Sequence, residues 1–115
     1  MKTIDINNKI SIEELKEMSE NRFGDLVKAV VDIEKEIMVV DAELHADQEK
    51  ALLEIGSQQQ NIWGINLYPD DIDEDFIEFD SMINLRPSWG NRSRGVDNEE
   101  IQKKIKIIVD SLVFV

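Results

Sequence analysis

The stretch that decides the fold is Val27-Lys-Ala-Val-Val-Asp-Ile-Glu-Lys-Glu-Ile-Met-Val-Val-Asp-Ala-Glu-Leu44. Apolar residues recur at every second position of both arms, and side chains on a β-strand alternate between two faces. We therefore predict a β-hairpin in which Ile33 pairs with Met38, so that the apolar sets of both arms share one face. This register also places Lys28 opposite Glu43 as an opposite-charge cross-strand pair. The turn residues between the arms are not those of the favoured short hairpin loops.

The rest of the chain supplies helices and further strands around this hairpin. The predicted elements are a short edge strand at 3–6, a helix begun by the capping box Ser11 to Glu14, a helix from Asp47 to Ile55, strands at 62–68 and 76–86, and a helix from Asp97 with Glu100 in a second capping box. In the strand at 62–68, the residues expected to point inward are Trp63, Ile65 and Leu67. In the strand at 76–86, the inward residues are Ile77, Phe79, Ile83 and Leu85, and the outward residues are Glu78, Asp80, Asn84 and Arg86. The apolar stripe of the last helix comprises Ile101, Ile105, Ile108 and Leu112. We predict an α+β fold with a mainly antiparallel four-stranded sheet and about three helices packed on one face. The other face of the sheet is then unusually polar.

Composition sets the outer bounds on the class of protein. The 115 residues, 42% of them hydrophobic, predict a single domain spanning residues 1–115. No apolar run approaches the roughly 18 residues of a membrane-spanning helix, and the first residues lack a signal-peptide pattern. The chain contains no cysteine, which excludes disulfides, zinc–thiolate sites and cysteine nucleophiles. We therefore expect a cytoplasmic protein with no membrane partner.

Basic charge is concentrated in one loop, Arg86-Pro-Ser-Trp-Gly-Asn-Arg-Ser-Arg-Gly95. The segment 81–96 contains no Asp or Glu and carries +3, whereas the whole chain carries −12, which leaves −15 for the remainder. Because contact with a phosphate backbone needs an extended positive face, this balance argues against nucleic-acid binding. The loop is the place where the sequence predicts a bound anion.

Several properties of this loop favour an anionic small molecule. The guanidinium fork of arginine suits carboxylate and phosphate groups, glycine and asparagine allow turns that expose N–H groups, and a helix amino terminus follows. A loop tryptophan has few packing reasons to be buried and could form a wall for a flat ligand. The predicted ligand-binding residues are Arg86, Trp89, Asn91, Arg92 and Arg94. The alternative is an internal network in which the arginines pair with Asp41, Glu43, Glu78 or Asp80 and lock the loop.

The polar sheet face supplies the candidates for chemistry, namely Asp80, Glu43 and His45. Asp80 lies beside Ser81, as a base next to a hydroxyl, and His45 has a pKa suited to proton transfer, although a capping or surface role fits its position better. Asp41 and His45 lie about 13 Å apart on a straight strand, too far for one metal ion. An ion would need Glu43, His45 and a carboxylate of the fourth strand, and we assign no metal ligands and no cofactor.

Five blocks carry a resemblance to a known family. They are Phe23–Asp32, Val40–Asp47, Trp63–Tyr68, Phe79–Asn84 and Arg86–Gly95. Together they resemble a small prokaryotic family catalogued only as a domain of unknown function, over nearly the whole chain. The resemblance implies a stand-alone cytoplasmic protein, and it implies no activity, cofactor or partner.

Three functions follow from these patterns. The first is a domain that binds an anionic small molecule through the arginine loop. The second is a hydrolase or phosphoryl-transfer enzyme, which requires Asp80 or Glu43 to lie within hydrogen-bonding reach of the arginines beside an open cavity. The third is an oligomerising protein-interaction domain, for instance a homodimer, that uses the polar sheet face, Trp89 or the apolar tail 112–115.

Overall fold

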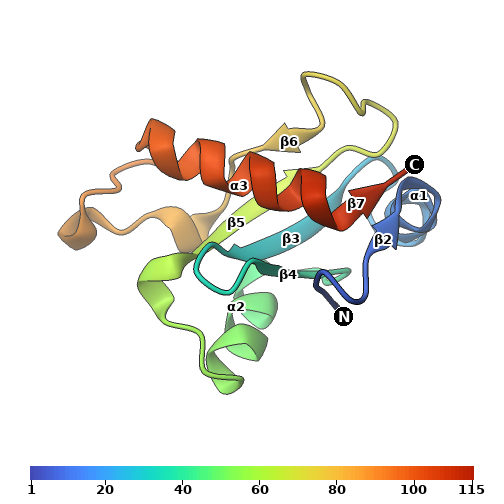
Figure 1. The fold of residues 1–115 in the computed structure, drawn as a ribbon. Helices are drawn as coiled ribbons and strands as arrows, with labels where there is room; N and C mark the ends of the chain where they lie inside the picture. The colour runs from blue at the N-terminus through green and yellow to red at the C-terminus, as the bar shows by residue number, and fades with distance from the viewer.

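The structure, a computed structural model that describes residues 1–115, is an α+β fold (Figure 1). The elements in chain order are β1 (Lys2–Ile4), β2 (Ile10–Ser11), α1 (Ile12–Asn21), β3 (Val27–Asp32), β4 (Ile37–Val40), α2 (His45–Glu54), β5 (Ile62–Leu67), β6 (Ile77–Glu78), α3 (Glu99–Leu112) and β7 (Val113–Phe114), with 3₁₀ turns at Gln59–Asn61, Met82–Asn84 and Pro87–Trp89. The main sheet is antiparallel in the order β1-β4-β3-β5-β6, and β2 pairs with β7 in a separate parallel pair. The sheet thus has five strands where four were predicted, because β1 pairs with β4 at the edge.

The predicted hairpin is present, but its register differs by two residues. Met38 pairs with Val31 rather than with Ile33, so the apolar sets still share one face and the predicted pair of Lys28 with Glu43 is wrong. The structure of the turn explains this difference in register. The carboxylate of Asp32 accepts hydrogen bonds from the backbone N–H groups of residues 34 and 35, which closes a four-residue loop at 33–36.

One face of the sheet forms the main hydrophobic core. Helices α1 and α3 cover this face, and Figure 1 shows α3 lying across β5 and β3. The predicted apolar stripe of α3 is confirmed, since Ile105, Ile108 and Leu112 are buried in the core. Trp63 and Ile65 of β5 point into the same core, as predicted.

The opposite face is only partly polar, and this corrects the prediction that all helices share one face. Helix α2 covers it and packs Leu52 against Val30, Val39 and Ile62 in a second apolar cluster. These three strand residues lie on the face that was expected to be polar. The polar remainder of the face is at the far end of β3, β5 and β6.

The predicted strand at 76–86 is wrong beyond its first residues. Only Ile77–Glu78 pairs with β5, and the chain then passes through a 3₁₀ turn at Met82–Asn84. Asn84, expected to point outward, is fully buried, whereas Leu85, expected to point inward, is exposed. Side-chain hydrogen bonds from Asn84 replace the strand pairing at this position.

The helix ends follow the predictions to within two residues. Ser11 caps α1 by accepting a hydrogen bond from the N–H of Glu14, as predicted. Helix α2 begins at His45, two residues before the predicted start, and Asn98 rather than Asp97 caps α3. Gly56 follows α2 with a φ of +97°, as a left-handed helix stop.

The apolar tail docks on the protein through its backbone. Val113 and Phe114 form β7, which pairs with Ile10 and Ser11 of β2. None of the three helices has the length and the apolar character needed to cross a membrane.

Candidate functional site

The three arginines of the loop point to different places. Arg86 reaches toward β5, Arg94 forms an ion pair with Asp80, and the side chain of Arg92 makes no hydrogen bond or ion pair. The alternative hypothesis, an internal network of ion pairs between these arginines and carboxylates, is therefore only partly correct. Asp41 and Glu43, two of its expected carboxylates, pair with Arg22 instead.

Arg86 lies between the only two tryptophans of the chain. Its guanidinium carbon is 4.5 Å from the ring centre of Trp63 and 5.7 Å from that of Trp89, which are cation–π distances. The terminal nitrogens donate hydrogen bonds to the backbone carbonyls of Gln59 and Ile62. No carboxylate lies within ion-pair distance, and burial lowers the pKa of Arg86 below its ordinary value, with Glu49 acting in the opposite direction.

This arrangement borders a cavity of about 330 Å³, here called the tryptophan–arginine pocket. Its lining residues are Gln60, Trp63, Arg86, Trp89, Gly90, Asn91, Asn98 and Ile101. Trp89 is 54% exposed and forms the outer wall, whereas Trp63 is almost buried. Three of the five predicted ligand-binding residues therefore meet at one cavity, and Trp63, which was read only as a core residue, joins them.

Asn91 shapes this pocket by holding the loop. Its side-chain nitrogen donates hydrogen bonds to the carbonyls of residues 84, 93 and 95, and its side-chain oxygen accepts one from the N–H of Asp97. All the polar groups of this buried side chain are thus engaged within the protein. The following helix offers little to an anion, since Asn98 already accepts hydrogen bonds from the N–H groups of Glu100 and Ile101.

Asp97 belongs to the loop rather than to the helix cap. Its carboxylate accepts hydrogen bonds from the hydroxyl of Ser93 and the N–H of Arg92, and these hold the pKa of Asp97 below its ordinary value. The loop is therefore fixed from both sides, by Asn91 within and by Asp97 outside.

A second cavity, of about 600 Å³, lies on the polar end of the α2-covered sheet face and is here called the sheet-face cavity. Its polar lining comprises Lys28, His45, Asn66, Tyr68, Glu78, Asp80, Ser81 and Arg94. Two of the three candidate catalytic residues, Asp80 and His45, therefore lie here together with Arg94. The Nε of Arg94 is 2.8 Å from Oδ1 of Asp80.

His45 is buried at the first turn of α2, and one of its ring nitrogens is fixed. Nε2 lies 2.8 Å from the backbone oxygen of Ile65, and a carbonyl only accepts, so Nε2 carries the proton. Nδ1 has no hydrogen-bond partner in the protein. Burial lowers the pKa of His45 below its ordinary value, and nearby Lys28 and Arg94 add to the effect of burial.

Tyr68 and Glu78 form the outer edge of this cavity. The phenol hydroxyl donates a hydrogen bond of 3.0 Å to Oε1 of Glu78, and the side-chain nitrogen of Asn66 donates another of 2.9 Å to the same atom. Burial together with the bond to Glu78 raises the pKa of Tyr68 to about 12.

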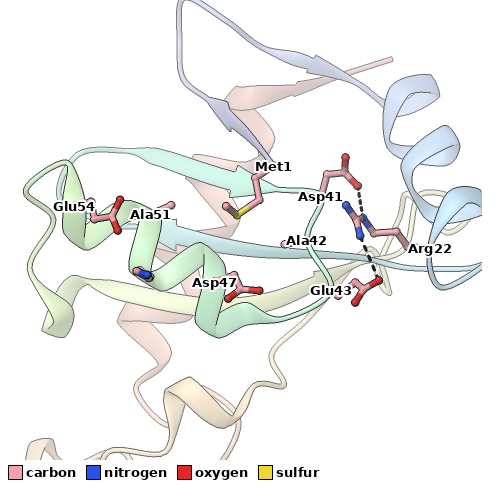
Figure 2. Close-up of a pocket in the computed structure, with 9 residues that line it drawn as sticks. Met1, Arg22, Asp41, Ala42, Glu43, Asp47, Ala51 and Glu54 are labelled. Carbon is pink, nitrogen blue, oxygen red and sulfur yellow. Dashed lines mark hydrogen bonds and ion pairs between the residues drawn. The ribbon is translucent and has the colours of Figure 1, made fainter.

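The third candidate, Glu43, lies apart from the other two. It lines a further cavity, of about 500 Å³. Figure 2 shows that Asp41 and Glu43 both point to Arg22 there. The Nε of Arg22 is 2.8 Å from Oδ1 of Asp41, and this hydrogen bond raises the pKa of Arg22. Glu43 and His45 are thus not brought to one point, and no group of three His, Asp or Glu side chains is arranged to hold a metal ion.

These features define a small α+β protein in which a basic loop and an antiparallel sheet enclose two ligand-sized cavities. A family model described as "Protein of unknown function (DUF5674)" matches residues 4–112, so the chain belongs to this family. The resemblance over nearly the whole chain is thereby confirmed. No curated protein and no solved structure matches the chain.

The sequence alone did not reveal several lining residues. Lys28 and Asn66 are ordinary strand residues whose role in the sheet-face cavity depends on the pairing of β3 with β5. One feature of the sequence would have pointed to Trp63 as a lining residue: it is one of only two tryptophans, and the other lies in the arginine loop.

Proposed function

We propose that the protein binds a small anionic molecule in the tryptophan–arginine pocket. The observation that carries this proposal is the guanidinium of Arg86, stacked on Trp63 beside Trp89 with no carboxylate in ion-pair reach.

An arginine without a carboxylate partner is unusual in a chain with this excess of acidic residues. The protein has 25 acidic and 13 basic side chains, so a cation has many carboxylates to pair with. Arg22 and Arg94 both have such partners. Arg86 instead is half-buried, and a buried charge without an opposite charge is unfavourable. An anionic ligand would supply the missing charge.

The pocket favours a planar carboxylate over a bulky polyanion. Two of the five N–H donors of Arg86 are used by backbone carbonyls, which leaves donors for one further acceptor group. The half-exposed ring of Trp89 offers a flat surface on which an aromatic ring stacks. A volume of about 330 Å³ is near the lower end of the range for small-molecule sites, roughly 300–1,000 Å³.

Tryptophan fluorescence tests the proposal directly, because both tryptophans of the chain line this pocket. The protein is titrated with benzoate, inorganic phosphate and a nucleoside monophosphate. We expect a saturable change with benzoate. The variant Arg86→Gln should bind at least about tenfold more weakly, since a charge-assisted hydrogen bond contributes roughly 1.5–3 kcal/mol.

Arg92→Gln is the matched control, because it removes the same charge from a side chain that makes no hydrogen bond or ion pair and does not line the pocket. Trp89→Leu provides a second test should Arg86→Gln fold poorly, since Trp89 is exposed and Trp63 still reports. A titration in which none of the three anions gives a saturable change overturns the proposal. Equal affinity in the wild type and in the Arg86→Gln variant overturns it as well.

The geometry supports binding better than the enzymatic alternative. Oδ1 of Asp80 is occupied by Arg94, as an enzyme would require. The neighbouring Ser81 hydroxyl is buried, however, and accepts the N–H of Ile83 as the cap of a 3₁₀ turn. This contact favours a structural role for the Ser81 hydroxyl over that of a nucleophile activated by Asp80.

A further inference from the structure

The floor of the sheet-face cavity is a row of three polar residues on adjacent strands. Lys28 of β3 is in register with Asn66 of β5, and Asn66 is in register with Glu78 of β6. Adjacent strands are about 4.8 Å apart, so the backbones at Lys28 and Glu78 are separated by roughly 10 Å. A positive and a negative side chain therefore flank the amide of Asn66.

Several charged atoms of this cavity lack a hydrogen-bond or ion-pair partner in the protein. The ammonium of Lys28 forms no hydrogen bond or ion pair, and its contact is a cation–π contact with the Phe23 ring at 5.3 Å. Glu78 uses Oε1 for Tyr68 and Asn66, and Asp80 uses Oδ1 for Arg94, so Oε2 and Oδ2 remain without donors.

The charges of the cavity balance. Lys28 and Arg94 are positive, Glu78 and Asp80 are negative, and His45 is neutral at pH 7 since burial lowers its pKa. In this cavity a simple anion meets two carboxylates and a simple cation meets two cationic side chains, whereas a ligand with one charge of each sign finds an opposite charge for both. The cavity is therefore complementary to a zwitterion.

His45 adds a hydrogen-bond acceptor beside the carboxylates. Because Nε2–H donates to the carbonyl of Ile65, the lone pair of Nδ1 remains available. This nitrogen can accept an N–H from an ammonium group. The acceptors that line the cavity are thus Glu78, Asp80 and Nδ1 of His45, and its cation without an ion pair is Lys28.

The rim of the cavity is apolar and exposed. Three large hydrophobic side chains that the fold leaves in contact with water line it, namely Phe23 at 40%, Leu44 at 56% and Met82 at 62% exposure. Leu26 and Ile83 line the same rim. An apolar group of a ligand would cover the exposed side of this surface.

From this geometry we infer that the sheet-face cavity binds a small apolar α-amino acid. The carboxylate of the ligand meets Lys28, its ammonium meets Glu78, Asp80 and Nδ1 of His45, and its side chain covers the rim formed by Phe23, Leu44 and Met82. The site is separate from the tryptophan–arginine pocket and does not depend on the function proposed there.

The single histidine of the chain reports on this cavity without ambiguity. Its imidazole signals are followed by NMR while three probes with a branched apolar chain are added: leucine, 4-methylpentanoate, which lacks the ammonium, and 3-methylbutylamine, which lacks the carboxylate. We expect a saturable shift of the His45 signals with leucine. The two analogues should bind at least about tenfold more weakly, because each loses one charged contact.

The variant Lys28→Met removes the cation and keeps an unbranched side chain, and it should weaken leucine binding at least about tenfold. The control is Lys104→Met, on the exposed side of α3. Glu78→Gln is a second variant at the opposite end of the floor. No saturable shift with leucine overturns the inference, and so do equal affinities for leucine and 4-methylpentanoate or for the wild type and Lys28→Met.

The two sites can fail independently. Benzoate binding in the tryptophan–arginine pocket changes tryptophan fluorescence, whereas leucine binding changes the His45 signals. A protein that gives one response without the other retains one site and loses the other.

Discussion

Asn84 completes the sheet at Gly64 with its side chain. Its Oδ1 accepts the backbone N–H of Gly64 at 2.8 Å, and its Nδ2 donates to the carbonyl of Gly64 at 2.9 Å. The amide therefore occupies the place that the backbone of a neighbouring strand would take. Nδ2 also donates to the carbonyl of Arg94, which ties the arginine loop to the sheet.

Replacing this amide should be strongly destabilising. In Asn84→Ala, both polar backbone groups of Gly64 lose their side-chain partner in a buried position, and each unsatisfied group costs about 1–3 kcal/mol. We expect a loss of about 2–4 kcal/mol in the free energy of unfolding, measured by urea denaturation. Asn7→Ala, an exposed position whose side chain makes no hydrogen bond, should change it by less than about 0.5 kcal/mol. A loss below about 1 kcal/mol for Asn84→Ala would contradict this account.

Gly64 is required because Ser81 packs directly against it. A Cβ added at residue 64 would lie 2.5 Å from both Cβ and Oγ of Ser81. Gly64→Ala should therefore destabilise the protein by about 1–3 kcal/mol or more. Ser81→Gly removes both clashing atoms, so the double variant should lose less stability than the two single losses added together. Strict additivity in this double-mutant cycle would rule out the steric cause.

The hairpin loop contains a strained residue. Glu36 has a φ of +57°, a left-handed conformation that disfavours side chains with a Cβ. Glu36→Gly should raise the free energy of unfolding by up to about 1 kcal/mol, since glycine adopts this conformation freely. Glu34→Gly, in the same loop but without a positive φ, should give no gain. A similar gain from both substitutions would point to lost negative charge rather than relieved strain.

The lowered pKa of His45 makes stability depend on pH. The unfolded chain takes up a proton near pH 6.5, and the folded protein does so only at lower pH because burial disfavours the imidazolium. Stability is therefore fully present above about pH 6.5 and is lost as the pH falls below that value. The charges near His45 are Lys28 and Arg94, which strengthen this effect, and Asp80, which opposes it.

His45→Gln separates this contribution from the other titrating groups. Urea denaturation of the wild type and the variant is compared at about pH 7.5 and about pH 5.5. The stability advantage of the wild type should shrink at the lower pH. A difference that does not vary with pH would mean that His45 titrates normally.

Tyr68 is the only tyrosine, so its ionisation can be followed by ultraviolet absorbance. We expect a midpoint near pH 12, well above the ordinary value of about 10, because burial and the bond to Glu78 favour the neutral phenol. Glu78→Gln should lower the midpoint. A wild-type midpoint near 10 would show that the phenol is solvated and not held by Glu78.

The sequence predicted the parts of the fold that depend on periodicity. The apolar face of the hairpin is correct even though its register is wrong, because a slip of two residues leaves every side chain on the same face. The stripe of α3 is correct for a similar reason, as Ile105, Ile108 and Leu112 recur at helical spacing.

The errors arose where a side chain replaced a backbone interaction. Nothing in local periodicity shows that Asn84 will pair with Gly64, so the strand after Phe76 was extended too far. The carboxylate of Asp32 likewise set the hairpin turn by binding two N–H groups. Val30 and Val39 did carry a readable signal, since apolar residues on a face expected to be polar indicate a covering helix.

The candidate site could be located from sequence only in outline. The distribution of charge along the sequence identified the arginine loop, which includes Trp89. It did not show that Arg86 and Arg94 would line two different cavities, because that depends on the turns that the side chain of Asn91 stabilises. Asp80 and His45 line the same cavity because of the order of β3, β5 and β6 in the sheet. That order cannot be predicted from any one segment of the sequence.

The pairing of β2 with β7 has a consequence for how the protein folds. Residues 10 and 113 are joined across almost the whole chain, and closing so long a loop costs more entropy than closing the four-residue hairpin turn. We expect this contact to form late, after the hairpin has nucleated the sheet. The main core also requires Ile105 to Leu112 of α3, so it stays incomplete during synthesis until that helix has left the ribosome.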